Sequence, residues 1–130
     1  MLTRRAFVAL AFAAVLSSCA HASLETSILD QLSFGREIPG GGTVTEADWA
    51  AFLAEVVTPV FPQGFAVVRT EGQWRYETGE IAHEQGFTLS VTHPPDPKFD
   101  AGIRTIIDSY KKRFHQESVL HMRQHVEAHF

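Results

Sequence analysis

Cysteine is nearly absent from this 130-residue chain, in which Cys19 stands alone. No disulfide can therefore form within the chain, and structural zinc sites built from several cysteines are excluded. Basic residues are also scarce, because eleven Lys and Arg stand against fifteen Asp and Glu. An acidic balance argues against nucleic acid or an anionic membrane surface as the main partner. The apolar fraction of 45% and the charged fraction of 20% are typical of a globular protein.

A long hydrophobic run is absent as well. The longest one covers residues 6–16 and is eleven residues long, whereas a membrane-spanning helix needs about 20. Because this run follows Arg4 and Arg5, it predicts a signal peptide over residues 1–18. The pair of arginines is compatible with either general or twin-arginine export. Removing the leader leaves nine basic residues and a net charge near −6.

The residues after the run resemble a bacterial lipobox. Leu16-Ser17-Ser18-Cys19 has the required order, so we expect a lipid on Cys19 and a membrane anchor there. Cleavage after Ala22 is the alternative, because Ala20-His21-Ala22 fits the small-x-small rule. Alanine rather than aspartate follows Cys19, which favours the outer membrane. We thus expect an exported, lipid-anchored protein on the periplasmic side of the envelope.

The remaining chain predicts a tether over residues 19–26 and one α+β domain over residues 27–130. Thr45 and Asp48 predict a helix cap, and apolar residues then recur at helical spacing from Trp49 to Val60. Asp96 and Pro97 predict the start of a second helix. Alternating apolar and polar residues predict strands at 28–34, 65–76, 86–93 and 118–128. This order fits a ferredoxin-like β-α-β-β-α-β two-layer sandwich, with an antiparallel sheet and both helices on one face.

Several segments together resemble a bacterial family of small secreted lipoproteins, classed as a domain of unknown function (number thirty-five seventy-four). They lie at residues 34–41, 49–59, 61–65, 72–75 and 110–120. The resemblance runs from about Leu32 to Phe130 and implies a secreted single domain, without an activity. Members tend to end in a stretch like Arg-Gln-Pro-Val-Cys, whereas this chain has Arg123-Gln124-His125-Val126-Glu127.

The histidines near the C-terminus raise the possibility of a metal site. His121, His125 and His129 are four residues apart, which on a helix would bring neighbours close enough to share an ion. The alternation of this segment predicts a strand instead, in which such residues lie about 13 Å apart. His125 and Glu127 are the weak candidates for a metal that survive, and we expect no metal or other cofactor.

Other candidates are acid–base groups and ligand contacts. His93 and His121 are candidate general bases, because the imidazole pKa is easily brought near neutrality. Arg36 and Arg123 are candidate clamps for a carboxylate or phosphate. Trp74 with Arg75 is a candidate ligand platform or interface anchor, or else a lid over the core. No Gly-x-Ser-x-Gly motif supports a hydrolase.

The function expected from the sequence is a non-enzymatic binding or interaction module, forming a homodimer or binding an envelope protein. Its surface would be the uncovered sheet face, expected to be lined by Gln31, Ser33, Thr88, Ser90, Thr92, His121, Arg123 and His125. The alternative is a small enzyme or ligand-binding protein of the dimeric α/β-barrel type, with a pocket between two open sheet faces. There His93 or His121 would act as acid or base.

Overall fold

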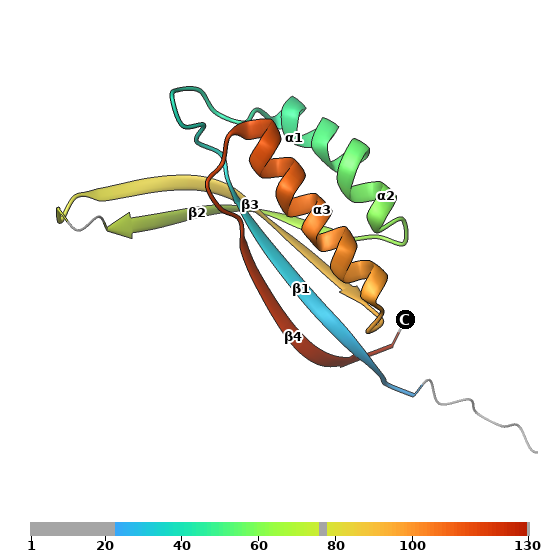
Figure 1. Cartoon of the computed structure of the whole chain (residues 1–130). Helices are drawn as coiled ribbons and strands as arrows, with labels where there is room; N and C mark the ends of the chain where they lie inside the picture. Colours follow the sequence, from blue (N-terminus) through green and yellow to red (C-terminus); the bar gives the residue numbers. More distant parts are fainter. Residues whose placement is uncertain (1–22, 76–77, 130) are drawn as a thin grey trace, which may run out of the picture.

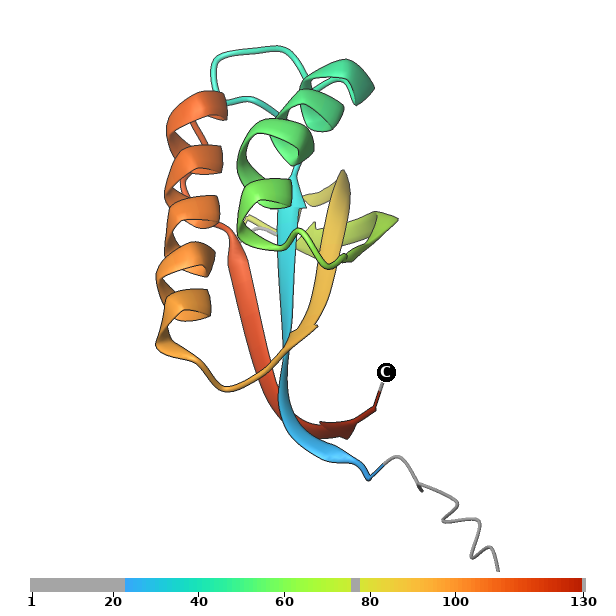
Figure 2. The ribbon, with the colours of Figure 1, turned by 90° about the vertical axis from the view of Figure 1, so that its right-hand side faces the viewer.

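The computed structural model describes residues 23–75 and 78–129. It contains one antiparallel sheet and two helical segments packed on one of its faces (Figures 1 and 2). The elements in chain order are β1 (Glu25–Gly35), α1 (Glu46–Phe52), a π-helical turn η1 (Leu53–Val57), α2 (Thr58–Val60), β2 (Ala66–Arg75), β3 (Ile81–His93), α3 (Pro97–Phe114) and β4 (Leu120–Ala128). The α+β class, the four-stranded antiparallel sheet and the two helices are thus confirmed. The predicted signal peptide and Cys19 lie outside the described residues.

The sheet has the order β2-β3-β1-β4. β1 is central, and it pairs with β3 through Leu32↔Leu89 and with β4 through Leu32↔His121. β2 and β3 form a long hairpin that extends beyond the helices (Figure 1). Its second strand begins at Ile81, five residues before the position predicted from the alternation at 86–93. The early part is exposed on nearly every residue, so it lacks the burial pattern by which a strand is recognised.

The first helical segment is one continuous helix over residues 46–60, with a π-helical turn in its middle. Thr45 caps it as predicted: its hydroxyl accepts from the Asp48 backbone, and the Asp48 side chain accepts from the Thr45 backbone. The helix does not end before Pro59 but runs through Val60. Pro59 has no N–H for the carbonyl of Glu55. The wider turn at Leu53–Val57, directly before it, accommodates the proline without breaking the helix.

The second helix, α3, begins as predicted at the Asp96 cap, whose side chain accepts from the Lys98 backbone. Together the two helices cover the face of the sheet that carries Leu32, Phe34, Phe87 and Leu89. The core between these layers is strongly aromatic: Trp49 stacks on Phe87 with ring centroids 4.3 Å apart, and Tyr110 meets Phe34 edge-on. Among the residues described, no helix is long and apolar enough to cross a membrane.

The other sheet face is not covered by any element of the described chain, and we call it the open face. Hydrogen bonds between Gln31 and Ser90 and contacts between the Ser33 and Thr88 hydroxyls place these side chains there. The strand register adds the following positions in the middle of the face: Leu29, Thr92, Ala66, Val68, Thr70, Leu120, Met122, Gln124 and Val126. It also places Ser27 on this face, and Glu25 and Glu84 at the two ends of the face.

One prediction about this face is wrong. His121, Arg123 and His125 pair with Leu32, Asp30 and Ile28, so they lie on the helix-covered side. The predicted alternation of polar and apolar residues along β4 is correct. The polar residues, however, face the helices and the apolar residues lie on the open face, which is the reverse of the prediction. The reason is electrostatic: β4 turns its polar side inward to reach a buried carboxylate on β1, and its apolar side is left on the open face.

Candidate functional site

The centre of the candidate site is Asp30, a carboxylate with no exposed surface in the middle of β1. It lies on the same face as Ile28, Leu32 and Phe34, among otherwise apolar side chains. Burying a charge there is expensive unless the charge is paired and hydrogen-bonded. Three basic side chains satisfy this condition, and we call Asp30, His93, His121, Arg123 and Asp100 the Asp30 cluster.

Both carboxylate oxygens of Asp30 accept two hydrogen bonds each. Oδ1 accepts from Arg123 Nε over 2.7 Å and from His121 Nε2 over 2.8 Å. Oδ2 accepts from Arg123 Nη2 and from His93 Nε2, each over 2.8 Å. The remaining guanidinium nitrogen, Nη1, forms an ion pair with Asp100 of α3 over 2.7 Å. The cluster therefore joins three neighbouring strands to the helix above them.

The protonation of Asp30 follows from the balance of two effects. Burial alone would raise the pKa of the carboxyl, because it penalises the charged form. The hydrogen bonds from Arg123, His93 and His121 outweigh burial and hold the pKa well below its usual range. Conversely, the hydrogen bond to Asp30 raises the pKa of Arg123. Asp30 and Arg123 are thus a fixed pair of opposite charges near neutral pH.

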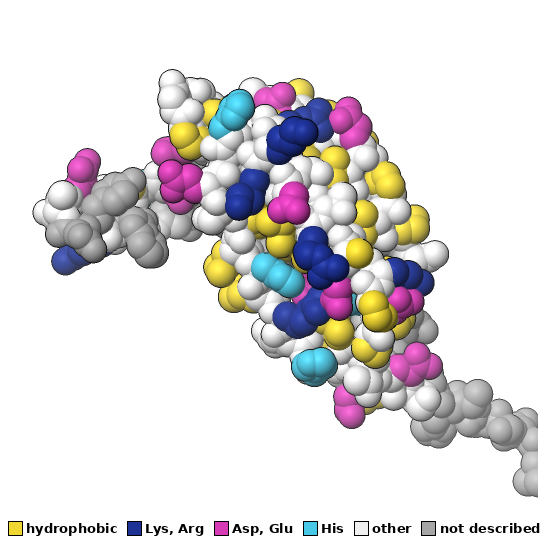
Figure 3. Space-filling model, viewed as in Figure 1, with side chains coloured by type: hydrophobic (Ala, Val, Ile, Leu, Met, Phe, Trp, Pro, Cys, Tyr) yellow, Lys and Arg dark blue, Asp and Glu magenta, His cyan; other side chains and the backbone are white. Residues whose placement is uncertain are grey.

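The two imidazoles differ in their surroundings. His93 is 3% exposed and lies against the rings of Phe61 and Phe99, whose centroids are 5.9 and 4.5 Å away. Its second nitrogen, Nδ1, donates to the carbonyl of Pro94 over 2.7 Å. The side chain of His121 is 29% exposed. Figure 3 shows this side of the molecule, where basic, acidic and histidine side chains gather over β4 and the adjoining part of α3.

The sequence-predicted residues are therefore partly brought together. His93, His121 and Arg123 meet at one carboxylate, although they lie far apart in the chain. Asp30 itself is missing from the predicted site, and its signal is present in the sequence: an aspartate on the apolar face of a strand that otherwise carries Ile28, Leu32 and Phe34. A charged residue at a core position departs from the apolar pattern of the strand, and such departures are expected at functional or strained positions.

Arg36 does not join this cluster. Its Nε donates to the Val44 carbonyl over 2.9 Å, Nη1 pairs with Glu46, and the guanidinium lies 5.0 Å from the centre of the Phe87 ring. It fastens the loop before α1 to the sheet. Arg123 pairs with Asp30, and Arg36 lies six residues further along the same strand direction. At about 3.3 Å per residue this separates the two arginines by roughly 20 Å, so they cannot bind one small ligand together.

The other predicted residues are dispersed. Arg75 is exposed at the end of β2, and the side chain of Trp74 lies outside what the structure describes. His125 and Glu127 are exposed on β4. No group of three His, Cys, Asp or Glu side chains is placed to hold a metal ion, as far as residues 23–75 and 78–129 are concerned.

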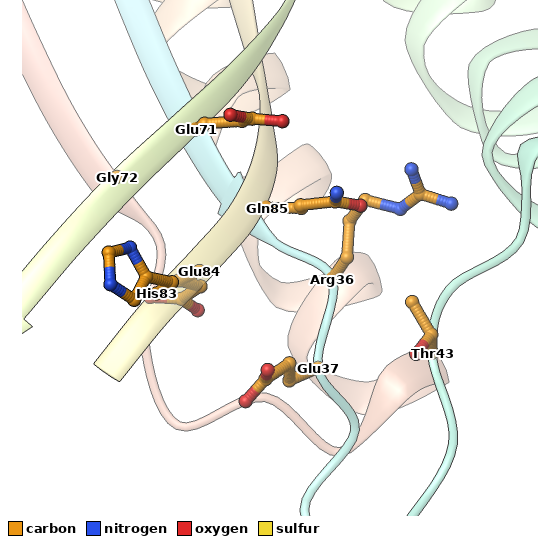
Figure 4. Close-up of a pocket in the computed structure, with 8 residues that line it drawn as sticks. All are labelled: Arg36, Glu37, Thr43, Glu71, Gly72, His83, Glu84 and Gln85. Carbon is orange, nitrogen blue, oxygen red and sulfur yellow. The ribbon is translucent and has the colours of Figure 1, made fainter. Parts of the chain in front are cut away.

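A separate hollow of about 380 Å³ lies where the β2–β3 hairpin leaves the body of the domain (Figure 4). Its wall contains Glu37, Glu71, Glu84 and His83. The guanidinium of Arg36 points away from His83 and Glu84 (Figure 4), because it is bound to the loop and to Glu46. A larger, open hollow of about 680 Å³ adjoins it on the other side of the hairpin. The geometry of these hollows selects no particular ligand.

Comparison with known proteins gives a family and a fold. Residues 29–130 match the family described as "Protein of unknown function (DUF3574)". No curated protein matches the chain. Among solved structures, it is similar to a phage SAM lyase in complex with S-methyl-5'-thioadenosine, with a TM-score of 0.59, 14% identity and coverage of 80% of this chain and 90% of that one. The apo state of a phage SAM lyase gives a TM-score of 0.58 at 14% identity, covering 79% and 85%.

Proposed function

The chain belongs to the family DUF3574, whose description gives no function, and we propose one from the surfaces of the domain. We propose that it is an exported, lipid-anchored module of the bacterial cell envelope that binds a second copy of itself through the open face. Its strand order, β2-β3-β1-β4, supports the ferredoxin-like arrangement expected from the sequence. The lipobox-like Leu16-Ser17-Ser18-Cys19 supports the anchor.

The absence of charge from the middle of the open face carries the proposal. Thirteen side chains lie there, and none is Asp, Glu, Lys, Arg or His, whereas the carboxylates of Glu25 and Glu84 lie at the two ends of this face. The thirteen are Leu29, Gln31, Ser33, Ala66, Val68, Thr70, Thr88, Ser90, Thr92, Leu120, Met122, Gln124 and Val126. On this face the two central strands carry mostly hydroxyl and amide groups, and the two edge strands carry mostly apolar side chains. Val68, Leu120 and Met122 are 57%, 58% and 44% exposed. Depletion of charge is the compositional mark of an interface core.

A second copy is the occupant that this composition fits best. In a two-fold symmetric contact the same patch meets itself, so a charge near the axis would face its own copy. A chain with a net charge near −6 avoids that repulsion where the middle of the contact carries no charge, and Glu25 and Glu84 lie at the ends of the face. Strands about 4.8 Å apart and residues about 3.3 Å apart give this face roughly 450 Å² of flat area. That size corresponds to the small end of specific interfaces, and we expect a reversible dimer.

A second candidate function is a dimer that encloses a small polar molecule between the open faces. The observation that favours it is the central band of Gln31, Ser33, Thr88 and Ser90, which could donate and accept hydrogen bonds. A structure similar in fold holds S-methyl-5'-thioadenosine. That molecule is therefore a reasonable first probe for this chain.

Adjacent residues of β2 offer a matched test of the dimer. Val68 lies on the open face and Val67 on the other side of the same strand. We expect native mass spectrometry and sedimentation of the protein purified from the periplasm to show a dimer. Val68→Lys should weaken it at least ten-fold, because two like charges would be brought together, whereas Val67→Lys should leave the dimer intact. A monomer at about 100 μM, or equal loss in both variants, would exclude the open face as the contact.

The same spectra test the second candidate function. A dimer that carries additional mass, or gains the mass of added S-methyl-5'-thioadenosine, would favour an enclosed ligand. The anchor is tested separately by incorporation of labelled fatty acid, which we expect to be lost in Cys19→Ala.

A further inference from the structure

β4 forms one edge of the sheet, and within the described chain no strand pairs with its outer side. We propose that this edge is an interaction surface for a second copy of the chain, whose β4 pairs with it antiparallel about His125. The two four-stranded sheets then join into one. The two-fold axis stands perpendicular to the sheet, so both open faces lie on the same side and stay uncovered. The proposal therefore goes beyond the open-face dimer and does not rest on it.

The backbone of β4 is suited to receive a further strand. It pairs with β1 at nine consecutive positions, from Leu120 to Ala128, without a bulge. In an antiparallel ladder every second residue bonds to one neighbour, and the residues between direct their N–H and C=O groups to the outer side. Natural edge strands are commonly blunted by proline, lysine, a bulge or a covering element. β4 contains no proline, lysine or glycine.

Helix α3 leaves the second half of this edge uncovered. Arg123 reaches Asp100 in the first turn of α3. Residues 124–128 of β4 run on beyond the start of that helix, as both views of the ribbon show (Figures 1 and 2). Each of these five residues is exposed or half-buried. A partner strand centred on His125 therefore has access to the backbone of β4.

The charges of β4 select its own copy as the partner. Arg123 and Glu127 lie on the same side of the strand, two positions before and two positions after His125. In antiparallel pairing about His125, Arg123 of each copy lies opposite the partner's Glu127. Opposite charges at facing positions stabilise a strand pair. Most other strands would leave these charges unmatched, so the same charges that exclude other strands admit this one.

Both charged groups have the capacity for this contact. The guanidinium of Arg123 has five N–H groups, of which two donate to Asp30 and one faces Asp100. Its side chain is 31% exposed. Glu127 takes part in none of the ion pairs within the described residues. Two N–H groups and a carboxylate therefore remain for the partner.

Other registers match the charges less well. Pairing about Arg123 would bring two guanidinium groups together at the axis. Pairing about Gln124 would place Arg123 opposite the partner's His125 instead of a carboxylate. The other edge strand, β2, contains a glycine, which weakens a strand. These comparisons favour β4 as the edge and His125 as the centre of the contact.

Disulfide trapping in the whole chain tests the contact and its register. With Cys19→Ala as background, His125→Cys would place two thiols on facing residues, whose Cα atoms lie about 4.5–5.5 Å apart, a separation that a disulfide spans. Gln124→Cys is the matched control, because Gln124 is also exposed on this strand but lies opposite the partner's Val126. Both proteins carry Val68→Lys, which removes any contribution of the open-face dimer.

A single pair of strands is a small contact, so we expect a transient association that oxidation traps. His125→Cys should form a linked dimer in oxidised glutathione at least five times faster than Gln124→Cys. The open face cannot produce this result, because His125 lies on the other side of the sheet. Equal rates for the two cysteine variants, or a faster rate for Gln124→Cys, would overturn the proposal.

The charge pairs are tested in the His125→Cys protein. Glu127→Arg would place guanidinium groups opposite each other, and we expect it to slow disulfide formation at least five-fold. Glu80→Arg makes the same change in net charge at an exposed position of the β2–β3 hairpin, away from β4. It should change the rate less than two-fold. Equal effects of the two charge reversals would show that the Arg123–Glu127 pairs do not form and would contradict this mode of pairing.

Discussion

Asp30 and Arg123 lie directly opposite one another on β1 and β4, joined by two hydrogen bonds of 2.7 and 2.8 Å. Because side chains alternate along a strand, a shift of β4 by one residue would turn Arg123 to the other side of the sheet. The pair therefore fixes the register of β4. It also explains why Leu120 and Met122 are exposed on the open face while polar residues face the helices.

Removing the guanidinium should destabilise the domain. Arg123→Met keeps a side chain of similar length but leaves Asp30 with only its two histidines, and it leaves Asp100 without its ion pair. We expect a loss of about 2 kcal/mol in the free energy of unfolding, less than for a fully buried pair because Arg123 is 31% exposed. Urea denaturation followed by circular dichroism would measure it.

Two further variants distinguish the loss of the Asp30–Arg123 ion pair from the effect of replacing any arginine by methionine. Arg104→Met changes an exposed arginine of α3 and should stay within about 0.5 kcal/mol of the unchanged protein. Asp30→Leu combined with Arg123→Met should recover stability relative to Arg123→Met alone, because the buried carboxylate that has lost its guanidinium is no longer present. If the double variant is no more stable than Arg123→Met, the buried charge is not the cause of the loss.

Acid should weaken the fold in a way that depends on Asp30. The pKa of Asp30 is lowered in the folded state, despite burial, by the hydrogen bonds of Arg123 and both histidines. A lowered pKa stabilises the fold above the unfolded value of about 3.9, and this stabilisation is lost as the pH falls toward the folded value. We therefore expect the free energy of unfolding to fall between about pH 4 and pH 2.

The comparison that isolates Asp30 is the slope of this fall in Asp30→Asn. Asp48 and Asp96 also have lowered pKa values, through hydrogen bonds to Thr45 and to the Lys98 backbone, and both remain in the variant. The slope should be shallower in Asp30→Asn, although the variant is less stable throughout. An identical slope would assign the acid sensitivity to the other carboxylates with lowered pKa values, which are Asp48, Asp96 and Glu46.

The layers of the fold were predictable from local chemistry. The Thr45–Asp48 cap, the Asp96–Pro97 start of α3 and the alternation in β1 are each specified by neighbouring residues. The start of β3 at Ile81 was not predictable, because exposed residues there pair with β2 without any burial pattern. The facing of β4 was not predictable from its own residues either. It depends on Asp30, ninety-three positions away from Arg123 in the chain.

The candidate site was predictable only in part, for the same reason. His93, His121 and Arg123 could each be predicted separately as candidate site residues. That they meet at Asp30 depends on strand order and register. Asp30 was the one local signal, a charge at a core position of β1. Once such a residue is noticed, basic residues at matching positions on other strands become its expected partners.

The Thr45 cap can be tested by a single substitution. Thr45→Ala removes the hydroxyl that accepts from the Asp48 backbone over 3.1 Å, and we expect a loss of about 1 kcal/mol. Thr105→Ala makes the same chemical change within α3, where the hydroxyl only donates to the Ala101 carbonyl. Alanine has the higher helix propensity, so this control should be neutral or slightly stabilising. Equal losses in the two variants would rule out capping as the cause.

The contact between the two helices depends on Gly102. A Cβ at this position of α3 would collide with Cγ1 of Val60, at the end of α2. Replacing a helical glycine by alanine gains about 1 kcal/mol of helix propensity, but overpacking a tight contact costs typically about 1–3 kcal/mol. Valine has little freedom to rotate away within a helix, so we expect the overpacking to prevail and Gly102→Ala to be destabilising. Val60→Ala should reverse that effect, making the double variant more stable than Gly102→Ala. Thermal unfolding of the four proteins would measure the coupling, and simple additivity of the two changes would show that the helices do not meet at this pair.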